Sequence, residues 1–250
     1  MPIIEIEEPE ELRNFRQKKP KASWNQLKAD RDVNHVVKVS VLKKTGGLCV
    51  YCEHKLVAKC DYQIEHYYPK KGNDNSDFGE GVPNRAIQWE NLLPGCLGGT
   101  ARDTDFSRKE DLDFRTGGNR KNRQKITCGQ KKKETEPEGV FIEPTKLDHN
   151  IPIFIFNDVD GSVSINEEAC EQQEIDIALA TSHVTRLNLN SPRLNGARLA
   201  LSTSLRKEFD LALSFDEGSV DELVKEWLKL NNEGLYDHPF ISLIASKYKV

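Results

Sequence analysis

Cys49-Val50-Tyr51-Cys52, which Leu48 separates from Gly46-Gly47, places two thiols on one tight turn. Paired thiols at this spacing suit a tetrahedral metal such as zinc, but one pair supplies only two of the four ligands. Cys96 and Cys128 are the candidates for the second pair, since each lies in a turn that contains glycine. We therefore predict one zinc site from Cys49, Cys52, Cys96 and Cys128, with Cys60 and His54 as reserve ligands. The alternative is a free CxxC with unrelated buried cysteines.

The rest of the chain favours reduced cysteines. The acidic N-terminus (MPIIEIEEPEELRNF) has neither the basic nor the long apolar region of a secretory signal. The longest apolar run, residues 151–156, is far too short to span a bilayer. We therefore expect a cytoplasmic protein without membrane association or disulfides, in which Cys170 is simply a buried thiol.

The net charge of −4 conceals two unlike halves. Residues 1–133 hold 26 Lys or Arg against 19 Asp or Glu, and residues 134–250 hold 10 against 21. A basic first half suits contact with phosphates, whereas the acidic second half does not. Solvated surface is the simpler explanation of either half, so charge alone decides little.

Three regions follow from the pattern of apolar residues and turns. Residues 1–45 are expected to be helical, although the β-branched stretch 33–42 could be helix or strand. Residues 46–145 hold five cysteines and a polar insertion, 98–125, with too few apolar residues to bury a core. Residues 146–250 should form a β-hairpin (151–156 with 163–165) and then three helices: about 167–187, one beginning at Ser191-Pro192, and one beginning at a Ser219/Glu222 capping box and ending near Gly234.

Two polar elements accompany the cysteines. Glu65-His66 follows a short apolar strand and precedes Pro69. A histidine can accept a proton from water near neutral pH, and a neighbouring carboxylate is a hard oxygen ligand suited to Mg²⁺. Asn91 lies five residues before Cys96, so zinc at Cys96 would fix the segment that carries Asn91. Taken alone, a Glu-His pair is more often an ordinary surface feature, and an Asn such as Asn91 more often lies in an ordinary turn.

Taken together, these elements resemble the motif of the HNH nucleases. The order is CxxC, then acid-His with a following Pro, then Asn-Leu before Cys96, then Cys128 with Lys132 four residues on, over about residues 46–135. The resemblance implies an α+β fold: a ββα-metal core with a structural zinc site, an N-terminal helical segment, and a C-terminal hairpin with helices. It implies a metal-dependent DNA endonuclease.

The family's roles carry over to matching positions. His66 resembles the general base that deprotonates the attacking water, Glu65 the ligand of a catalytic Mg²⁺ or Mn²⁺, and Asn91 the residue that orients them. Cys49, Cys52, Cys96 and Cys128 resemble the zinc ligands. One position departs from the family: a His, Asn or Asp ligand usually follows the last cysteine, where this chain has Gly129. A replacement ligand could be Gln130, Asn122, Asp103, Asp105 or water.

The C-terminal region carries a further resemblance. Residues 141–144 (FIEP) and 185–194 (TRLNLNSPRL) are similar to HNH proteins that accompany ATPases in the Septu system and in a class of retrons, where the nuclease is called PtuB. This implies an anti-phage effector whose residues 146–250 bind an ABC-type ATPase of the PtuA kind. The alternatives are a catalytically degenerate zinc-binding adaptor, which Gly129 favours, and a stand-alone restriction-type HNH nuclease.

Contact with DNA should involve the basic residues around the last cysteine. No acidic residue interrupts the tract of Arg120, Lys121, Arg123, Lys125, Lys131, Lys132 and Lys133. We expect them to follow the phosphate backbone, although a solvated loop is the alternative. The basic run between Arg13 and Lys21 more simply covers a helix. One active site should nick one strand, so a double-strand break would require self-association.

Overall fold

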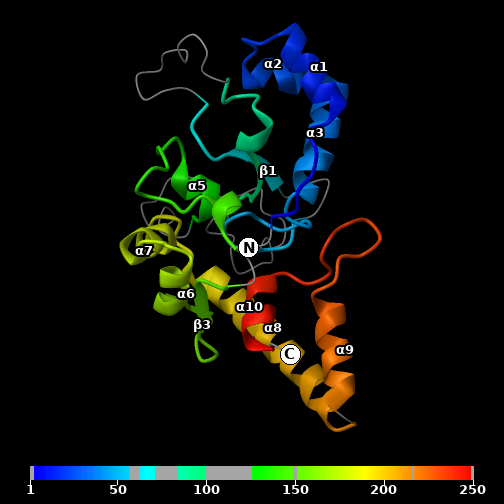
Figure 1. The fold of residues 1–250 in the computed structure, drawn as a ribbon, viewed down its shortest axis with the longest axis vertical. Helices are drawn as coiled ribbons and strands as arrows, with labels where there is room; N and C mark the ends of the chain where they lie inside the picture. The colour runs from blue at the N-terminus through cyan, green and yellow to red at the C-terminus, as the bar shows by residue number, and fades with distance from the viewer. Residues whose placement is uncertain are drawn as a thin grey trace.

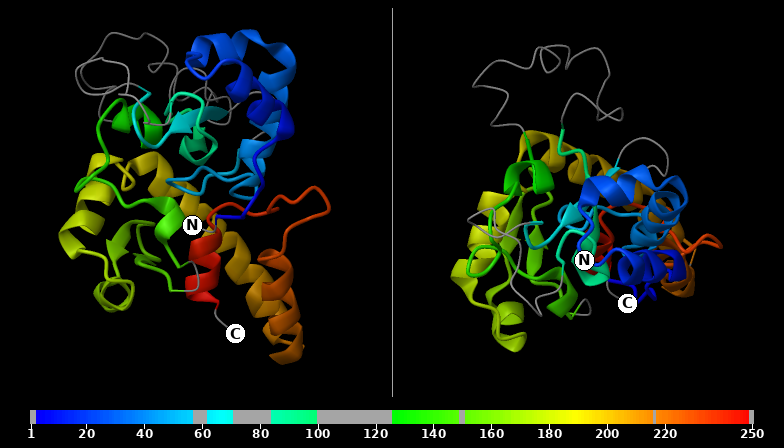
Figure 2. Two further views of the ribbon diagram at one scale, coloured as in Figure 1. Left: turned by 45° about the horizontal axis from the view of Figure 1, so that its top comes forward. Right: turned by 90° about the horizontal axis from the view of Figure 1, so that it is seen from above.

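The computed structural model describes residues 3–56, 62–70, 84–99, 126–148, 151–215 and 217–248. Helices α1, α2 and α3 lie at one end of the molecule, and helices α8 and α9 extend toward the other (Figure 1). The strands β1 and β2 and the short helix α5 lie between these ends, and Figure 2 shows the same arrangement from two further directions. In the described part of the chain, no helix is long and apolar enough to cross a membrane.

Three helices form the N-terminal end: α1 (Glu10–Lys18), α2 (Trp24–Ala29) and α3 (Arg31–Lys43). Ser23 and Gln26 form a capping box at the start of α2, and the Asp30 side chain caps α3. The β-branched stretch that could have been helix or strand is therefore helix. Its valines recur every four residues, so that Val33, Val37 and Val41 form one buried face.

The centre of the molecule is a two-stranded antiparallel sheet of β1 (Tyr62–His66) and β2 (Leu92–Cys96). Tyr62 lies opposite Cys96, and His66 lies opposite Leu92. A 3-10 turn, η1 (Trp89–Asn91), leads into β2, and α5 (Cys128–Lys132) packs against β2. The alternation of a strand directs Glu65 toward α5 and His66 toward the N-terminal helices.

The predicted C-terminal hairpin is present but shorter, with β3 (Phe154–Phe156) antiparallel to β4 (Val163–Ile165). The single helix predicted for 167–187 is wrong, because the structure has α6 (Glu167–Gln172) and α7 (Ile177–Arg186). Glu174 adopts a positive φ of 54°, and the side chain of Asp176 accepts a hydrogen bond from the Ala178 backbone. These two features end one helix and cap the next.

The last helices are α8 (Pro192–Leu213), α9 (Glu217–Trp227) and α10 (Ile241–Lys247). A short 3-10 turn, η4 (Pro144–Lys146), precedes the hairpin. The start predicted for α8 is confirmed, with Ser191 as N-cap and Pro192 in the first turn. The start predicted for α9 is wrong: the helix already begins two residues before Ser219 and ends at Trp227 rather than near Gly234. Helix α10 was not predicted.

The C-terminal segment packs against the turn that carries Cys49 and Cys52. The Phe240 backbone N–H donates to the Glu53 carbonyl at 2.9 Å, and the Glu53 carboxylate accepts from the Ser242 N–H at 2.8 Å and from its hydroxyl. The Tyr236 N–H donates to the carbonyl of Gly46, whose φ is +58°. A Cβ on Gly46 would lie 2.4 Å from the Tyr236 ring, so this close approach requires glycine.

Candidate active site

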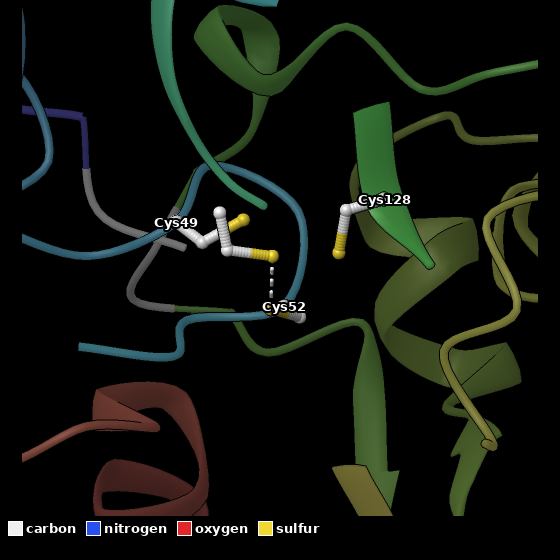
Figure 3. A group of neighbouring side chains, drawn as sticks. Cys49, Cys52 and Cys128 are labelled. Carbon is white, nitrogen blue, oxygen red and sulfur yellow. Dashed lines mark hydrogen bonds between the residues drawn. The ribbon is translucent and has the colours of Figure 1, made fainter. Parts of the chain in front are cut away.

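The four predicted thiols meet in one buried cluster. The Sγ atoms of Cys49, Cys52, Cys96 and Cys128 all lie within 4.8 Å of one another. The labelled side chains of Cys49, Cys52 and Cys128 direct their sulfurs into a shared space (Figure 3). The prediction that these cysteines come together is confirmed, and four thiols at this spacing fit a tetrahedral zinc ion. His54 is not part of the cluster, and Cys60 lies outside the described residues.

Three separate elements bring the thiols together. Cys49 and Cys52 lie on a turn closed by a hydrogen bond from the Cys49 N–H to the His54 carbonyl, 2.9 Å. The same turn is joined to β2, because the Val50 N–H donates to the Pro94 carbonyl. Cys96 ends β2, and Cys128 begins α5. A zinc ion here would therefore fix the strand and the helix on both sides of Glu65.

Ionisation of the four thiols is coupled. Burial raises the pKa of Cys52 and of Cys128 well above the ordinary thiol value. Burial also disfavours the thiolate of Cys49, but hydrogen bonds from the neighbouring thiols outweigh it and hold the pKa of Cys49 well below that value. A buried site that holds negative charge on closely spaced sulfurs is chemically suited to a divalent cation.

His66 is buried at the end of β1 and is held by a backbone carbonyl. Its Nε2 lies 3.0 Å from the carbonyl oxygen of Ala86, which can only accept, so we assign the ring proton to Nε2. The indole of Trp24 lies edge-on to the imidazole, with 4.9 Å between the ring centroids. Burial lowers the pKa of His66 from 6.5 to about 4. The imidazole is therefore neutral at pH 7, with Nδ1 as the proton acceptor.

Asn91 connects the segments on either side of His66. Its amide nitrogen donates to the carbonyls of Tyr68 (2.9 Å) and Arg85 (2.7 Å), and its amide oxygen accepts from the Tyr68 N–H at 2.7 Å. Arg85 precedes Ala86, whose carbonyl holds the His66 ring. Asn91 thus fixes both the exit of β1 and the loop that orients His66, as an organising residue requires.

Glu65 lies on the other side of the strand, beside α5. Its Oε1 is 3.5 Å from the Lys132 ammonium and 3.4 Å from the Tyr51 hydroxyl. Burial raises the pKa of Glu65 from 4.5 to about 7, although the charge of Lys132 opposes the shift. A carboxylate in this position offers the hard oxygen ligands that Mg²⁺ and Mn²⁺ prefer.

Two lysines at this site, Lys44 and Lys132, are buried and support the site, which the sequence did not predict. Lys44 donates to the carbonyls of Trp89 (2.6 Å) and Leu92 (3.0 Å), and so fixes the turn that carries Asn91. Lys132 was assigned to the DNA-contacting surface, but the structure buries its side chain completely against Glu65. That surface assignment is corrected. No local signal in the sequence marks this burial, because the partners Glu65 and His66 lie far from Lys132 in the chain.

The remaining residues predicted for the site fall into three groups. Lys131 and Lys133 are exposed on α5 and its end, where a phosphate could reach them. Several assigned positions lie outside the described residues: Arg120, Lys121, Arg123, Lys125, Asp103, Asp105 and Asn122. Gln130 is described, and its amide donates to Gln63 at 2.7 Å.

Comparison with known proteins gives relatives of one kind. The chain is 27% identical to the "Retron Ec83 putative HNH endonuclease" of Escherichia coli over 86% of its length and 88% of that protein. It is 27% identical to the "Retron Vc95 putative HNH endonuclease" of Vibrio cholerae, with 78% of each chain covered. A shorter match, 34% identical over 30% of this chain and 27% of the relative, is the Septu protein PtuB of Bacillus thuringiensis.

No family model matches the chain, and no solved structure matches it. The evidence of kinship is therefore the similarity in sequence, which covers most of the chain in the two retron proteins. The chain is therefore similar to proteins named as retron HNH endonucleases and, over a shorter stretch, to a Septu protein, which supports an HNH endonuclease of the anti-phage type.

Proposed function

We propose that this protein is a metal-dependent HNH endonuclease that hydrolyses DNA phosphodiester bonds as the effector of an anti-phage system. The observation that carries the proposal is His66, a neutral imidazole with Nε2 held by the Ala86 carbonyl and Nδ1 available to accept a proton. Asn91 holds the same loop, and Glu65 precedes His66 on β1, with its side chain on the opposite face of the strand. Strands β1 and β2 with α5 are the parts from which we infer a ββα-metal core.

The residues divide the work of hydrolysis. His66 takes the proton from the attacking water at Nδ1, which requires the neutral ring that burial maintains. Glu65 is the residue that would hold a divalent ion, and Mg²⁺ or Mn²⁺ bound there would offset the charge that builds up on the phosphate. The four cysteines hold zinc and so fix β2 and α5 around these residues. Lys131 and Lys133, with the basic tract that precedes Cys128, are proposed to contact DNA phosphates.

Zinc-loaded protein should convert supercoiled plasmid to nicked circles in Mg²⁺ or Mn²⁺ and leave it intact when these ions are withheld. The reason is that Glu65 supplies one carboxylate, so the hydrolytic ion should exchange readily while the four buried thiols retain zinc. Gel electrophoresis of the plasmid gives the measurement. A zinc-loaded protein that leaves plasmid uncut in both ions would instead support the second candidate, a zinc-binding adaptor, which the absent side chain at Gly129 favours.

We also propose an ABC-type ATPase as partner, bound through residues 146–250. In support, the chain is similar to a Septu protein, and the end of α8 exposes large apolar side chains: Leu211, Leu213 and Phe215. Exposed apolar groups gathered at one place are typical of protein contacts. The double variant L211S/F215S should lose co-purification with the co-expressed ATPase but still nick plasmid. Val39→Ser removes an exposed apolar residue of α3, outside residues 146–250, and should change neither result. If the protein never co-purifies with an ATPase, the alternative of a stand-alone nuclease would be supported.

A further inference from the structure

Lys132 is a charged residue in an unexpected place. Its side chain is 0% exposed, although lysine is seldom fully buried without a partner. The ammonium donates to the His66 carbonyl at 3.0 Å and lies 3.5 Å from Glu65 Oε1. One side chain therefore contacts both neighbouring residues of the proposed active site, the carboxylate of the first and the backbone of the second.

Helix α5 explains how Lys132 reaches this place. The helix begins at Cys128, one of the four clustered thiols, and Lys132 follows one helical turn later on the same side. Because Cys128 is fixed in the cysteine cluster, the position of Lys132 relative to β1 is fixed as well. The neighbouring Lys131 and Lys133 are exposed, so burial is a property of Lys132 alone among these three.

Gly129 supplies the space that this contact needs. A Cβ on Gly129 would lie 2.1 Å from Glu65 Oε2 and 2.8 Å from Glu65 Cδ. Gly129 is not among the glycines with positive φ, so its backbone would accept alanine. Glycine is required here because the carboxylate of Glu65 occupies the place where a side chain would begin.

We propose that Lys132 is a positioning residue that holds the Glu65 carboxylate across the bare backbone of Gly129 and sets its distance from His66. The proposal rests on the proposed function, since it assigns Glu65 to a divalent ion. In related nucleases, helix α5 would carry a metal ligand at position 129. Here the same helix instead carries Lys132, whose ion pair orients Glu65. Lys132 touches neither substrate nor ion; it acts through Glu65 and through the His66 carbonyl.

The test is direct binding of Mn²⁺ to zinc-loaded protein, followed by electron paramagnetic resonance. Lys132→Met keeps the length of the side chain but removes its charge and its donors, so Glu65 loses the group that directs it. We expect the Mn²⁺ dissociation constant to rise roughly 10- to 100-fold, as when a residue that orients a metal ligand is removed. Lys38→Met, a change of the same kind at an exposed position on α3, should leave it within twofold.

A second variant covers the case in which Lys132→Met fails to fold or to retain zinc. Gly129→Ala replaces glycine with a better helix former but displaces Glu65, and it leaves Lys132 in place. It should weaken Mn²⁺ binding by a similar factor. In the double variant the two effects should not add, because both act by moving Glu65. Fully additive effects, or Mn²⁺ affinity unchanged in zinc-loaded Lys132→Met, would overturn the role of Lys132.

Plasmid cleavage by the same proteins separates this proposal from the proposed function. If the wild type binds Mn²⁺ but cuts no DNA, and Lys132→Met weakens binding, the nuclease proposal fails and the role of Lys132 stands. If the wild type cuts DNA and Lys132→Met binds Mn²⁺ normally, the role of Lys132 fails and the nuclease proposal stands. A wild type that binds no Mn²⁺ and cuts no DNA in Mg²⁺ or Mn²⁺ overturns both. Glu65→Gln, which should abolish binding, identifies the site.

Discussion

Replacing His66 with alanine should reduce plasmid cleavage by roughly 10²- to 10⁴-fold, the usual contribution of a positioned general base. The structure gives the reason: His66 is the group at the end of β1 whose neutral ring is fixed through Nε2 and leaves Nδ1 as acceptor. The measurement is the initial rate of nicking at saturating Mn²⁺. Zinc content and the denaturant midpoint should stay close to those of the wild type, because the cysteine cluster is formed by other residues.

His35→Ala is the matched control for this change. His35 lies on α3 with its side chain exposed, and no role is assigned to it. Its replacement should leave the rate of nicking unchanged. If His66→Ala cuts plasmid as fast as the wild type while it retains zinc, His66 is not the general base, and the proposed mechanism is incorrect.

Replacing Cys128 with serine should remove zinc and unfold the centre of the molecule. The four thiols lie inside a hydrophobic cluster with Leu93, Leu187 and Leu194. An ion bound to them would therefore lie within the hydrophobic core and not at the surface. Zinc bound by small thiol-containing domains contributes about 10–16 kcal/mol, which is comparable to the whole stability of an ordinary domain. Loss of one ligand should therefore abolish the cooperative unfolding transition of the native protein.

Elemental analysis and urea denaturation provide the two measurements. Cys170→Ala is the control, because Cys170 is also buried but packs in a separate cluster with Ile142 and Ala180. It should retain one zinc per chain and shift the unfolding midpoint only slightly. A Cys128→Ser protein with full zinc content and an unchanged midpoint would show that the cluster is not a zinc site.

The sequence anticipated local features better than contacts between distant residues. The meeting of the four cysteines could be predicted, because Cys49 and Cys52 form a CxxC turn and Cys96 and Cys128 each lie in a turn that contains glycine. The start of α8 was marked by Ser191-Pro192 in the same local way. The break between α6 and α7 was missed although Asp176 is a capping residue, because the apolar pattern continues across it. Ser219 and Glu222 resemble a capping box, yet α9 had already begun.

The burial of two lysines could not be predicted from the residues next to them in the sequence. Lys44 and Lys132 look like solvent-facing residues in basic stretches, and nothing next to them in the chain contradicts that interpretation. Their burial depends on carbonyls and a carboxylate at least 45 residues away. Long-range partners of this kind follow only from the assembled fold. The sequence therefore located the candidate catalytic residues but not the cations that support them.

The contact between Glu53 and Ser242 has a consequence for how the molecule folds. It joins residues 189 positions apart, and closing so long a loop costs conformational entropy before any contact compensates for it. Zinc bound to Cys49, Cys52, Cys96 and Cys128 would act as an early cross-link that shortens this loop in the unfolded chain. We therefore expect metal capture to precede docking of the C-terminal segment, so that the supply of zinc sets the pace of folding.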